Sequence, residues 1–132
     1  HLGRSMQLHG SVPHAGVGEA IDSCHLFAFS SVREGQVLAA LEILSRGRPL
    51  VGTPVGVFPE LLSEPRFGAL APLENAAGFA EGLVRVAREL TGGTLTPEMV
   101  QGAYRQKFSR DRVLDQYIRL FEELAGAKVA CG

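Results

Sequence analysis

Short apolar runs alternate with longer amphipathic stretches along this chain. The runs are almost continuously apolar, which is typical of strands buried on both faces of a sheet. They lie at residues 6–12, 25–29, 49–53 and 68–71. The amphipathic stretches repeat apolar residues at helical spacing and therefore predict helices. They lie at residues 13–24, 36–46 and 74–90, from Thr96 onward, and at 112–125, with a brief helical turn at 59–62.

This alternation predicts a Rossmann-like α/β fold with a doubly wound parallel sheet. An open sheet of this kind commonly has about five or six strands, whereas the pattern here predicts only four. We therefore expect an incomplete half-domain over residues 6–126. Residues 1–5 are expected to be a tag remnant or a cut end, and residues 127–132 a frayed tail.

The composition agrees with a single globular domain and argues against several functional classes. The 132 residues are 45% hydrophobic and 20% charged, with a net charge of -1, so neither disorder nor a general attraction to nucleic acid is expected. The two cysteines, Cys24 and Cys131, lack the spacing of a metal site. No apolar run reaches the length of a membrane span and no secretory leader is visible, so we expect a cytoplasmic protein.

The candidate chemistry lies in residues 30–60. This segment follows a predicted buried strand, turns, and opens a helix, and ligands of doubly wound sheets bind at such turns. The N-terminus of a helix presents free amides and the positive end of its dipole, which attract phosphate. Gly35 permits an anion to approach the backbone closely, and Glu34 stands directly before it on the ligand side.

A second glutamate, Glu42, lies at the border of the apolar stripe of this helix. Burying a carboxylate is costly without hydrogen-bond donors, so we expect Glu42 to be partly buried and to meet donors such as two sugar hydroxyls. The helical rise places it about 12 Å along from Glu34. That separation suits a nucleoside diphosphate sugar, from its ribose to its hexose. The alternative is a half-exposed Glu42 that pairs with Arg46 one turn later.

Several short motifs follow one another in a fixed order. They are residues 8–12, Glu34 and Glu42 with seven residues between them, Gly47-Arg48-Pro49, Val51-Gly52-Thr53, Val55-Gly56 with Pro59-Glu60, and Tyr117 with Leu120 and Phe121. The series resembles the C-terminal, donor-binding domain of family 4-like retaining glycosyltransferases (glycosyl transferases group 1). Those enzymes have the two-domain GT-B architecture, so the resemblance implies a nucleotide-sugar-binding, Rossmann-like domain.

The resemblance also implies a role for each matching residue. Glu34 is expected to be the catalytic residue that faces the transferred sugar, and Glu42 to bind the ribose. The base is expected near Val12. For His14, in the turn that follows, a surface or core position is favoured over contact with the base. The sugar and diphosphate are expected at the amides of Gly35, Gln36, Val37 and Leu38. The family implies no metal and no cofactor, only a nucleoside diphosphate sugar as donor and a hydroxyl of a glycan, lipid or small molecule as acceptor.

The sequence departs from the family pattern at three points. Gln36-Val37 stands where the family often has Phe-Gly, and Val57 replaces the second glycine of a Val-Gly-Gly motif. The family places an Arg and a Lys that neutralise the diphosphate on a βα unit upstream of Met6. Because that unit and the acceptor-binding domain are outside this sequence, we expect the chain by itself to be inactive.

Two alternatives remain beside the enzyme. A non-catalytic α/β module could use the same surface for interaction or dimerisation, with self-association through an exposed sheet edge. A nucleotide-sugar epimerase of the same architecture is disfavoured because it lacks the two-glutamate series. A local basic cluster is expected to be a solvated face, and peripheral contact with the inner face of a membrane stays open. The cluster consists of Arg105, Lys107, Arg110 and Arg112.

Overall fold

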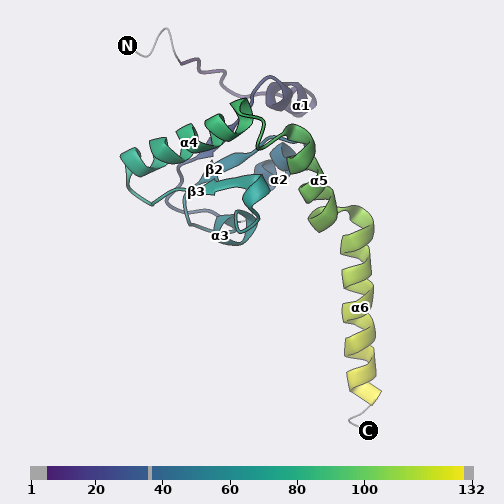
Figure 1. Ribbon diagram of the computed structural model, residues 1–132. Coiled ribbons are helices and arrows are strands. Elements are labelled where there is room, and N and C mark those ends of the chain that lie inside the picture. Colours follow the sequence, from purple (N-terminus) through teal and green to yellow (C-terminus); the bar gives the residue numbers. More distant parts are fainter. Residues whose placement is uncertain (1–5, 36, 130–132) are drawn as a thin grey trace.

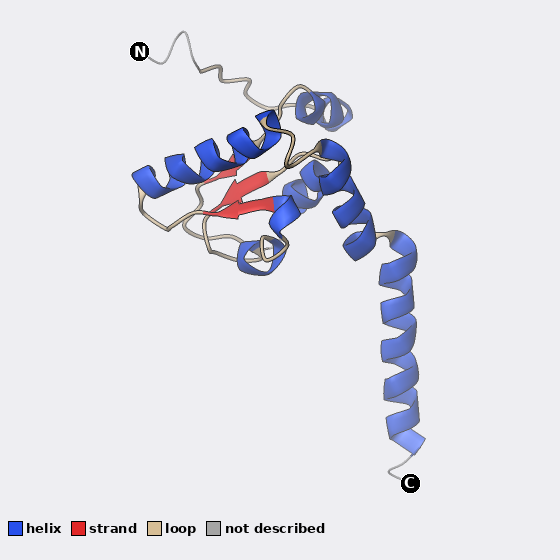
Figure 2. Ribbon diagram, viewed as in Figure 1, coloured by secondary structure: helices blue, strands red, loops and turns tan. Residues whose placement is uncertain are grey.

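The computed structural model describes residues 6–35 and 37–129. A parallel sheet of three short strands is flanked by helices, as Figure 2 shows. The strands are β1 (Phe27–Phe29), β2 (Leu50–Gly52) and β3 (Gly68–Leu70). The helices are α1 (His14–Asp22), α2 (Leu38–Ser45), α3 (Phe58–Leu61), α4 (Ala76–Thr91), α5 (Pro97–Phe108) and α6 (Arg110–Val129), with a 3-10 turn η2 at Pro65–Phe67. The predicted parallel, Rossmann-like α/β fold is confirmed.

The strands lie in the sheet in the order β1-β2-β3, which is also their order in the chain. Ala28 of β1 lies beside Val51 of β2, and Val51 lies beside Ala69 of β3. Every residue of the central strand β2 is buried, as its continuous apolar run predicts. Within the described residues the strand order does not reverse, so this sheet corresponds to one flank of a doubly wound sheet.

The prediction of a strand at residues 6–12 is wrong. The described part of the chain forms no strand there, and Leu8 is 93% exposed. Gly10 has a φ of +65°, which breaks the extended conformation in the middle of the run. A strand is stable only where neighbours complete its backbone hydrogen bonds, and no described strand pairs with this segment.

Helices cover both faces of the sheet, with α4 on one side and α3 on the other in Figure 1. Val51 faces α4, where Gly82 permits a close approach: a Cβ at Gly82 would lie 3.2 Å from Val51 Cγ1. Gly52 faces the opposite way, and a Cβ there would lie 2.9 Å from the ring of Phe58. Phe58 is fully buried and its ring centroid is 5.1 Å from that of Phe29. The core therefore continues through the sheet.

The two longer helices of the body begin at side-chain caps that the sequence signals. Asn75 Oδ1 accepts from the Gly78 amide at 2.9 Å at the start of α4, and Thr96 Oγ1 accepts from the Met99 amide at 3.3 Å at the start of α5. Helix α5 then packs on α2, where Gln101 Nε2 donates to the Ser45 carbonyl at 2.9 Å. These contacts fix α2, which carries the predicted site.

Helix α6 extends away from the body, as Figure 1 shows. It begins two residues before the predicted boundary and ends beyond the other one. Most of its apolar side chains are exposed in the described chain. The exposed residues are Leu114, Tyr117, Ile118, Leu120, Phe121 and Leu124. Among residues 6–35 and 37–129, no helix combines the length and the apolar character needed to cross a bilayer.

Candidate functional site

The loop after β1 holds the first predicted glutamate. Ser31 Oγ donates a hydrogen bond to Glu34 Oε1 at 2.5 Å, so the carboxylate is held within its own loop. The loop is in turn attached to the end of β2. The Thr53 hydroxyl, which is buried, donates to the Ser31 carbonyl, and the Thr53 amide donates to the Phe29 carbonyl at 3.1 Å. Glu34 therefore stands at the carboxyl end of β1, as predicted.

A second loop, between β2 and α3, presses against this turn. Gly56 has a φ of +56°, and a Cβ on it would lie 2.6 Å from the Glu34 carbonyl oxygen and 2.8 Å from that of Gly35. Only glycine combines this backbone conformation with this closeness. The backbone of Glu34 and Gly35 is thus positioned by direct contact with a residue more than twenty positions away.

The N-terminus of α2 is open on its outer side. Val37 is its N-cap residue, and within the described chain no side chain caps the helix. Gly35 is exposed, with no atom within 4 Å of the position of a Cβ. Leu38, the first helical residue, is 69% exposed. Gln36, the remaining residue predicted to bind here, lies outside the described residues.

Glu42 is exposed, so the expected partial burial of this residue is wrong. The buried face of α2 is formed by Ala40, Ile43 and Leu44, and Glu42 lies outside it. The alternative pairing with Arg46 is not found either, because Arg46 Nη1 contacts Asp22 Oδ2 instead. Position on the helix brought Glu42 near the apolar stripe, but packing against the sheet decided which flank became solvent-facing.

Glu42 instead lines a cleft between α1 and α2 with a volume of about 320 Å³. His14, in the first turn of α1, lines the same cleft. The full lining comprises His14, Ala15, Val17, Gly18, Ile21, Glu42, Ser45 and Arg46. Val12 is not part of it; its side chain is 40% exposed and lies beside Gly16.

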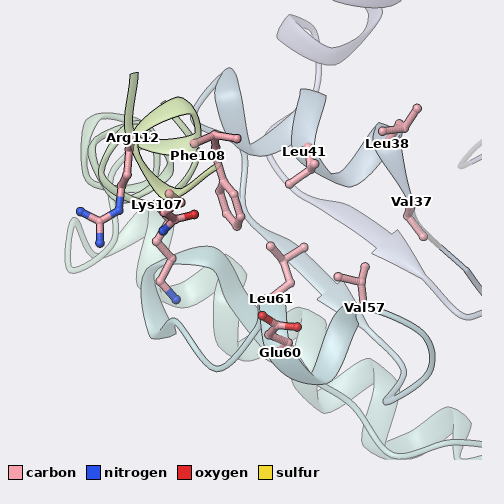
Figure 3. Close-up of a pocket in the computed structure, with 11 residues that line it drawn as sticks. Val37, Leu38, Leu41, Val57, Glu60, Leu61, Lys107, Phe108 and Arg112 are labelled. Atoms are coloured by element: carbon pink, nitrogen blue, oxygen red, sulfur yellow. The ribbon is translucent and has the colours of Figure 1, made fainter. Parts of the chain in front are cut away.

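Two further clefts border the predicted site. One, of about 500 Å³, lies where all three strands end, beside Ser30, Thr53 and Pro72, and is bordered by the first turn of α4. The other, of about 450 Å³, lies between α2, α3 and the junction of α5 with α6, and Figure 3 shows it. Val37 and Leu38 line one part of this cleft, while Lys107 and Arg112 of the basic cluster line another.

Within the described residues, no group of three or more His, Cys, Asp or Glu side chains is placed to hold a metal ion. The clearest change in acidity lies elsewhere, at Glu64. A side-chain hydrogen bond from Arg66 lowers the pKa of Glu64 below its usual 4.5, and Arg66 Nε lies 2.7 Å from Glu64 Oε1.

Comparison with known proteins assigns the family. The family described as "Glycosyl transferases group 1" matches residues 1–89, about two-thirds of the chain. The chain belongs to this family. The matched range contains Glu34 and Glu42, together with Gly56. The resemblance to GT-B glycosyltransferases, drawn from the order of the motifs, is confirmed.

Two relatives show how much of a glycosyltransferase the chain represents. It is 26% identical over 121 residues to one of the subunits of human phosphatidylinositol N-acetylglucosaminyltransferase, covering 91% of this chain and 25% of that protein. Its fold is similar to sucrose-phosphate synthase from Thermosynechococcus elongatus, with a TM-score of 0.74 and 19% identity, covering 96% of this chain and 32% of that one. The chain thus spans a quarter to a third of these relatives.

Three residues that position the candidate site were not predicted from the sequence. They are Ser31, Thr53 and Gly56, which hold the loop of Glu34. Thr53 and Gly56 lie inside the motifs that carry the family resemblance, and this was the available signal. The motifs contain both residues, but their order in the chain does not indicate that they touch the loop after β1.

Proposed function

We propose that this chain is the donor-binding part of a glycosyltransferase that transfers a sugar from a nucleoside diphosphate sugar to a hydroxyl, with retention at the anomeric carbon. One observation carries the proposal. In a member of the group 1 family, Glu34 is held by Ser31 and by the Gly56 contact beside an open, uncapped end of α2. The carboxylate and the helix N-terminus can therefore face one ligand.

The diphosphate is proposed to bind at the N-terminus of α2. The first amides of a helix have no partner within it, and the dipole adds positive potential there. Among the described residues, the first backbone hydrogen bond at this end of α2 runs from the Ala40 amide to the Val37 carbonyl, at 3.0 Å. Gly35 leaves the approach unobstructed. Both features favour an anionic group of the size of a diphosphate.

Glu34 is proposed to stabilise the sugar as its bond to the diphosphate breaks. The anomeric carbon then gains positive charge while the leaving oxygen gains negative charge. A fixed carboxylate on one side and helix amides on the other lower the energy of this separated state, because they are oriented before the reaction begins. The acceptor oxygen bonds to the anomeric carbon at the face that the diphosphate leaves, and the hydroxyl proton passes to the departing diphosphate oxygen, so the configuration is retained.

Glu42 and His14 are proposed to hold the nucleoside in the cleft between α1 and α2. Among the described residues, neither salt bridge involves Glu42 and no side-chain hydrogen bond engages its carboxylate. Both of its oxygens are therefore open to the ribose hydroxyls. His14 lies in the same cleft, where the base would follow the ribose. Val12 is proposed to border the base from outside the cleft.

Catalysis is proposed to require more protein than this chain. The human relative is named for a reaction of phosphatidylinositol, and the chain covers 25% of its length. We propose a hydroxyl-bearing acceptor for the whole enzyme, a lipid being one such class. The chain itself should bind nucleotide weakly, in the millimolar range, and should not turn over a donor.

Titration of the isotope-labelled chain with UDP, GDP and their sugars, followed by NMR, tests the proposal. The expected result is a set of shifts at residues 34–38 and at Glu42 and His14. Glu34→Gln should leave the binding of the free nucleotide unchanged but abolish the additional contribution of the sugar. Glu42→Gln should weaken the nucleotide itself. Glu81→Gln, at an exposed position of α4, is the matched control and should change neither.

Two results would contradict the proposal. Nucleotide-induced shifts confined to other surfaces would remove the assigned site. Turnover of a donor by the chain alone would show that the missing length is not needed. Loss of nucleotide binding in the Glu81→Gln control would show instead that removing any carboxylate weakens binding through the net charge of the chain.

The exposed face of α6 favours a second candidate, a non-catalytic interaction or dimerisation module. Apolar side chains from Leu114 to Leu124 line this helix without cover in the described chain, and such a surface often marks an interface. The same titration separates the candidates, because a module of this kind gives no nucleotide-dependent shift at residues 34–38. Sedimentation of the chain at increasing concentration measures its self-association directly.

A further inference from the structure

Helix α1 is attached to the body mainly at its C-terminal end. Ile21 is its one buried residue. The next residue, Asp22, accepts hydrogen bonds from two arginines, one at the end of α2 and one in the turn that follows it. Arg46 Nη1 donates to Asp22 Oδ2, and Arg48 Nη2 donates to the Asp22 carbonyl at 2.9 Å. A polar clamp therefore joins the last residue of α1 to the end of α2.

Arg46 passes over Gly18 to reach Asp22, which lies one helical turn further along the same face of α1. A Cβ placed on Gly18 would overlap the Arg46 guanidinium, with Cζ at 2.8 Å and Nη1 at 3.3 Å. The guanidinium thus lies directly on the helix surface, in a space that any other residue would fill. Gly18 has ordinary helical φ, so glycine is needed here because it has no side chain where the guanidinium lies.

The same arginine borders the cleft of Glu42. Gly18 and His14 line the cleft from α1, while Glu42 and Arg46 line it from α2. Asp22 is outside this lining. The spacing of the two walls therefore depends on a residue that lies on the α1 wall at Gly18 and holds a partner, Asp22, one helical turn further along the same face.

We propose that Arg46 is a positioning residue. By passing over Gly18 to hold Asp22, it sets how far α1 and His14 stand from Glu42. The role of the clamp in donor binding rests on the proposed function, whereas the clamp itself does not. The side chains of Arg46 and Asp22 are 41% and 51% exposed, and exposed ion pairs contribute little to global stability. The effect of the clamp should therefore be local to α1.

Hydrogen–deuterium exchange of the chain tests the clamp with a matched pair of variants. Gly18→Ala and Gly16→Ala both replace a glycine of α1 by a better helix former. Only the first displaces Arg46, because a Cβ on Gly16 would meet just Val12 Cγ1 at an ordinary 3.4 Å. Since an isolated helix this short is marginal, protection of α1 depends on its attachment. Because both variants gain the same helix propensity, the difference between them measures the clamp: Gly18→Ala should leave α1 about fivefold less protected than Gly16→Ala does.

Equal α1 protection in Gly18→Ala and Gly16→Ala, or unchanged α1 protection in Arg46→Gln, would overturn the clamp. A fall that extends to β1, β2 and β3 in either variant would also overturn it, because the effect would then be global unfolding. Arg46→Lys keeps the charge and the reach to Asp22, so it should recover part of the protection that Arg46→Gln loses.

A double-mutant cycle tests the link to donor binding. Arg46→Gln should raise the Kd for UDP about fivefold, and Asp22→Asn should do the same although Asp22 is outside the cleft. The two changes together should have no more effect than either alone, because they remove one interaction. Additive losses, or a normal Kd in Asp22→Asn, would mean that Arg46 acts on the ligand directly and would overturn the positioning role. If the wild-type chain binds no nucleotide, the proposed function fails, while the exchange data still decide the clamp.

Discussion

The contact between Gly56 and the Glu34 turn can be tested by adding one carbon atom. Gly56→Ala places a methyl group 2.6 Å from the Glu34 carbonyl oxygen and 2.8 Å from the Gly35 carbonyl oxygen. Both atoms belong to the backbone and cannot rotate away as a flexible side chain could. Either the Glu34 loop or the loop of Gly56 has to move.

The cost has two parts that can be worked out separately. An alanine in the left-handed region, at a φ of +56°, costs about 1–2 kcal/mol. Overpacking against rigid atoms adds about 1–3 kcal/mol. The sum is about 2–5 kcal/mol, compared with about 5–15 kcal/mol for the stability of a typical domain. We therefore expect a folded but clearly less stable protein.

Urea denaturation of Gly56→Ala beside Gly93→Ala isolates the steric part. Gly93 has a φ of +71° and nothing within 4 Å of its Cβ position, so its substitution carries the backbone cost alone. Gly56→Ala should therefore be less stable than Gly93→Ala by about 1–3 kcal/mol. In the NMR spectrum, Gly56→Ala should also shift the amide signals of Glu34 and Gly35, whereas Gly93→Ala should not.

Equal losses of stability in the two variants would refute the close approach of the loops. A large loss in Gly56→Ala without shifts at Glu34 and Gly35 would place the strain elsewhere. In that case Gly56 would still be a turn residue, but it would not determine where the candidate catalytic carboxylate stands.

Two further predictions concern stability. Thr53→Val keeps the buried shape but removes the hydroxyl that donates to the Ser31 carbonyl. It should lower the free energy of unfolding in urea by about 1–3 kcal/mol, and Thr53→Ser should recover most of this loss. An unchanged free energy of unfolding in Thr53→Val would show that the hydrogen bond is dispensable. Because Arg66 lowers the pKa of Glu64 below 4.5, the stabilisation from this pair is present above that value and is lost as pH falls through the lower, folded-state pKa. Thermal melts between pH 6 and about 3 should show a smaller acid-induced loss in Glu64→Gln than in the wild type, and equal slopes would contradict this assignment.

Much of the fold could be predicted from local patterns. β2 was predictable because a central strand of a parallel sheet is apolar on both faces. Thr96 followed by Pro97 indicated the start of α5. The strand expected at residues 6–12 failed because an apolar run does not reveal whether a neighbour exists to pair with it. Gly10, in the middle of that run, was the sign that its backbone turns.

The candidate site was predictable to a similar depth. Glu34 and Gly35 follow the apolar strand β1, and that order is enough to place them at the carboxyl end of the sheet. The expected burial of β1 on both faces is wrong, because Phe27 and Phe29 are half-buried and Ala28 is exposed in this edge strand of the described sheet. The burial of Glu42 was not predictable, because a residue at the edge of an apolar stripe turns toward the core or away from it according to how the helix rests on its neighbours. In this chain Arg46 pairs with Asp22 of α1, and not with Glu42 one turn earlier in its own helix.

The order of residues along the chain was sufficient to determine the family, the strand-turn-helix that presents Glu34, and the chemistry those residue types can offer. Tertiary structure alone decided that Thr53 and Gly56 hold that turn, and that α1 and α2 enclose the cleft of Glu42 and His14. The physical reason is distance along the chain. Helix and strand signals arise from residues a few positions apart, whereas these contacts join segments about twenty or more positions apart and exist only once the sheet and its helices have packed.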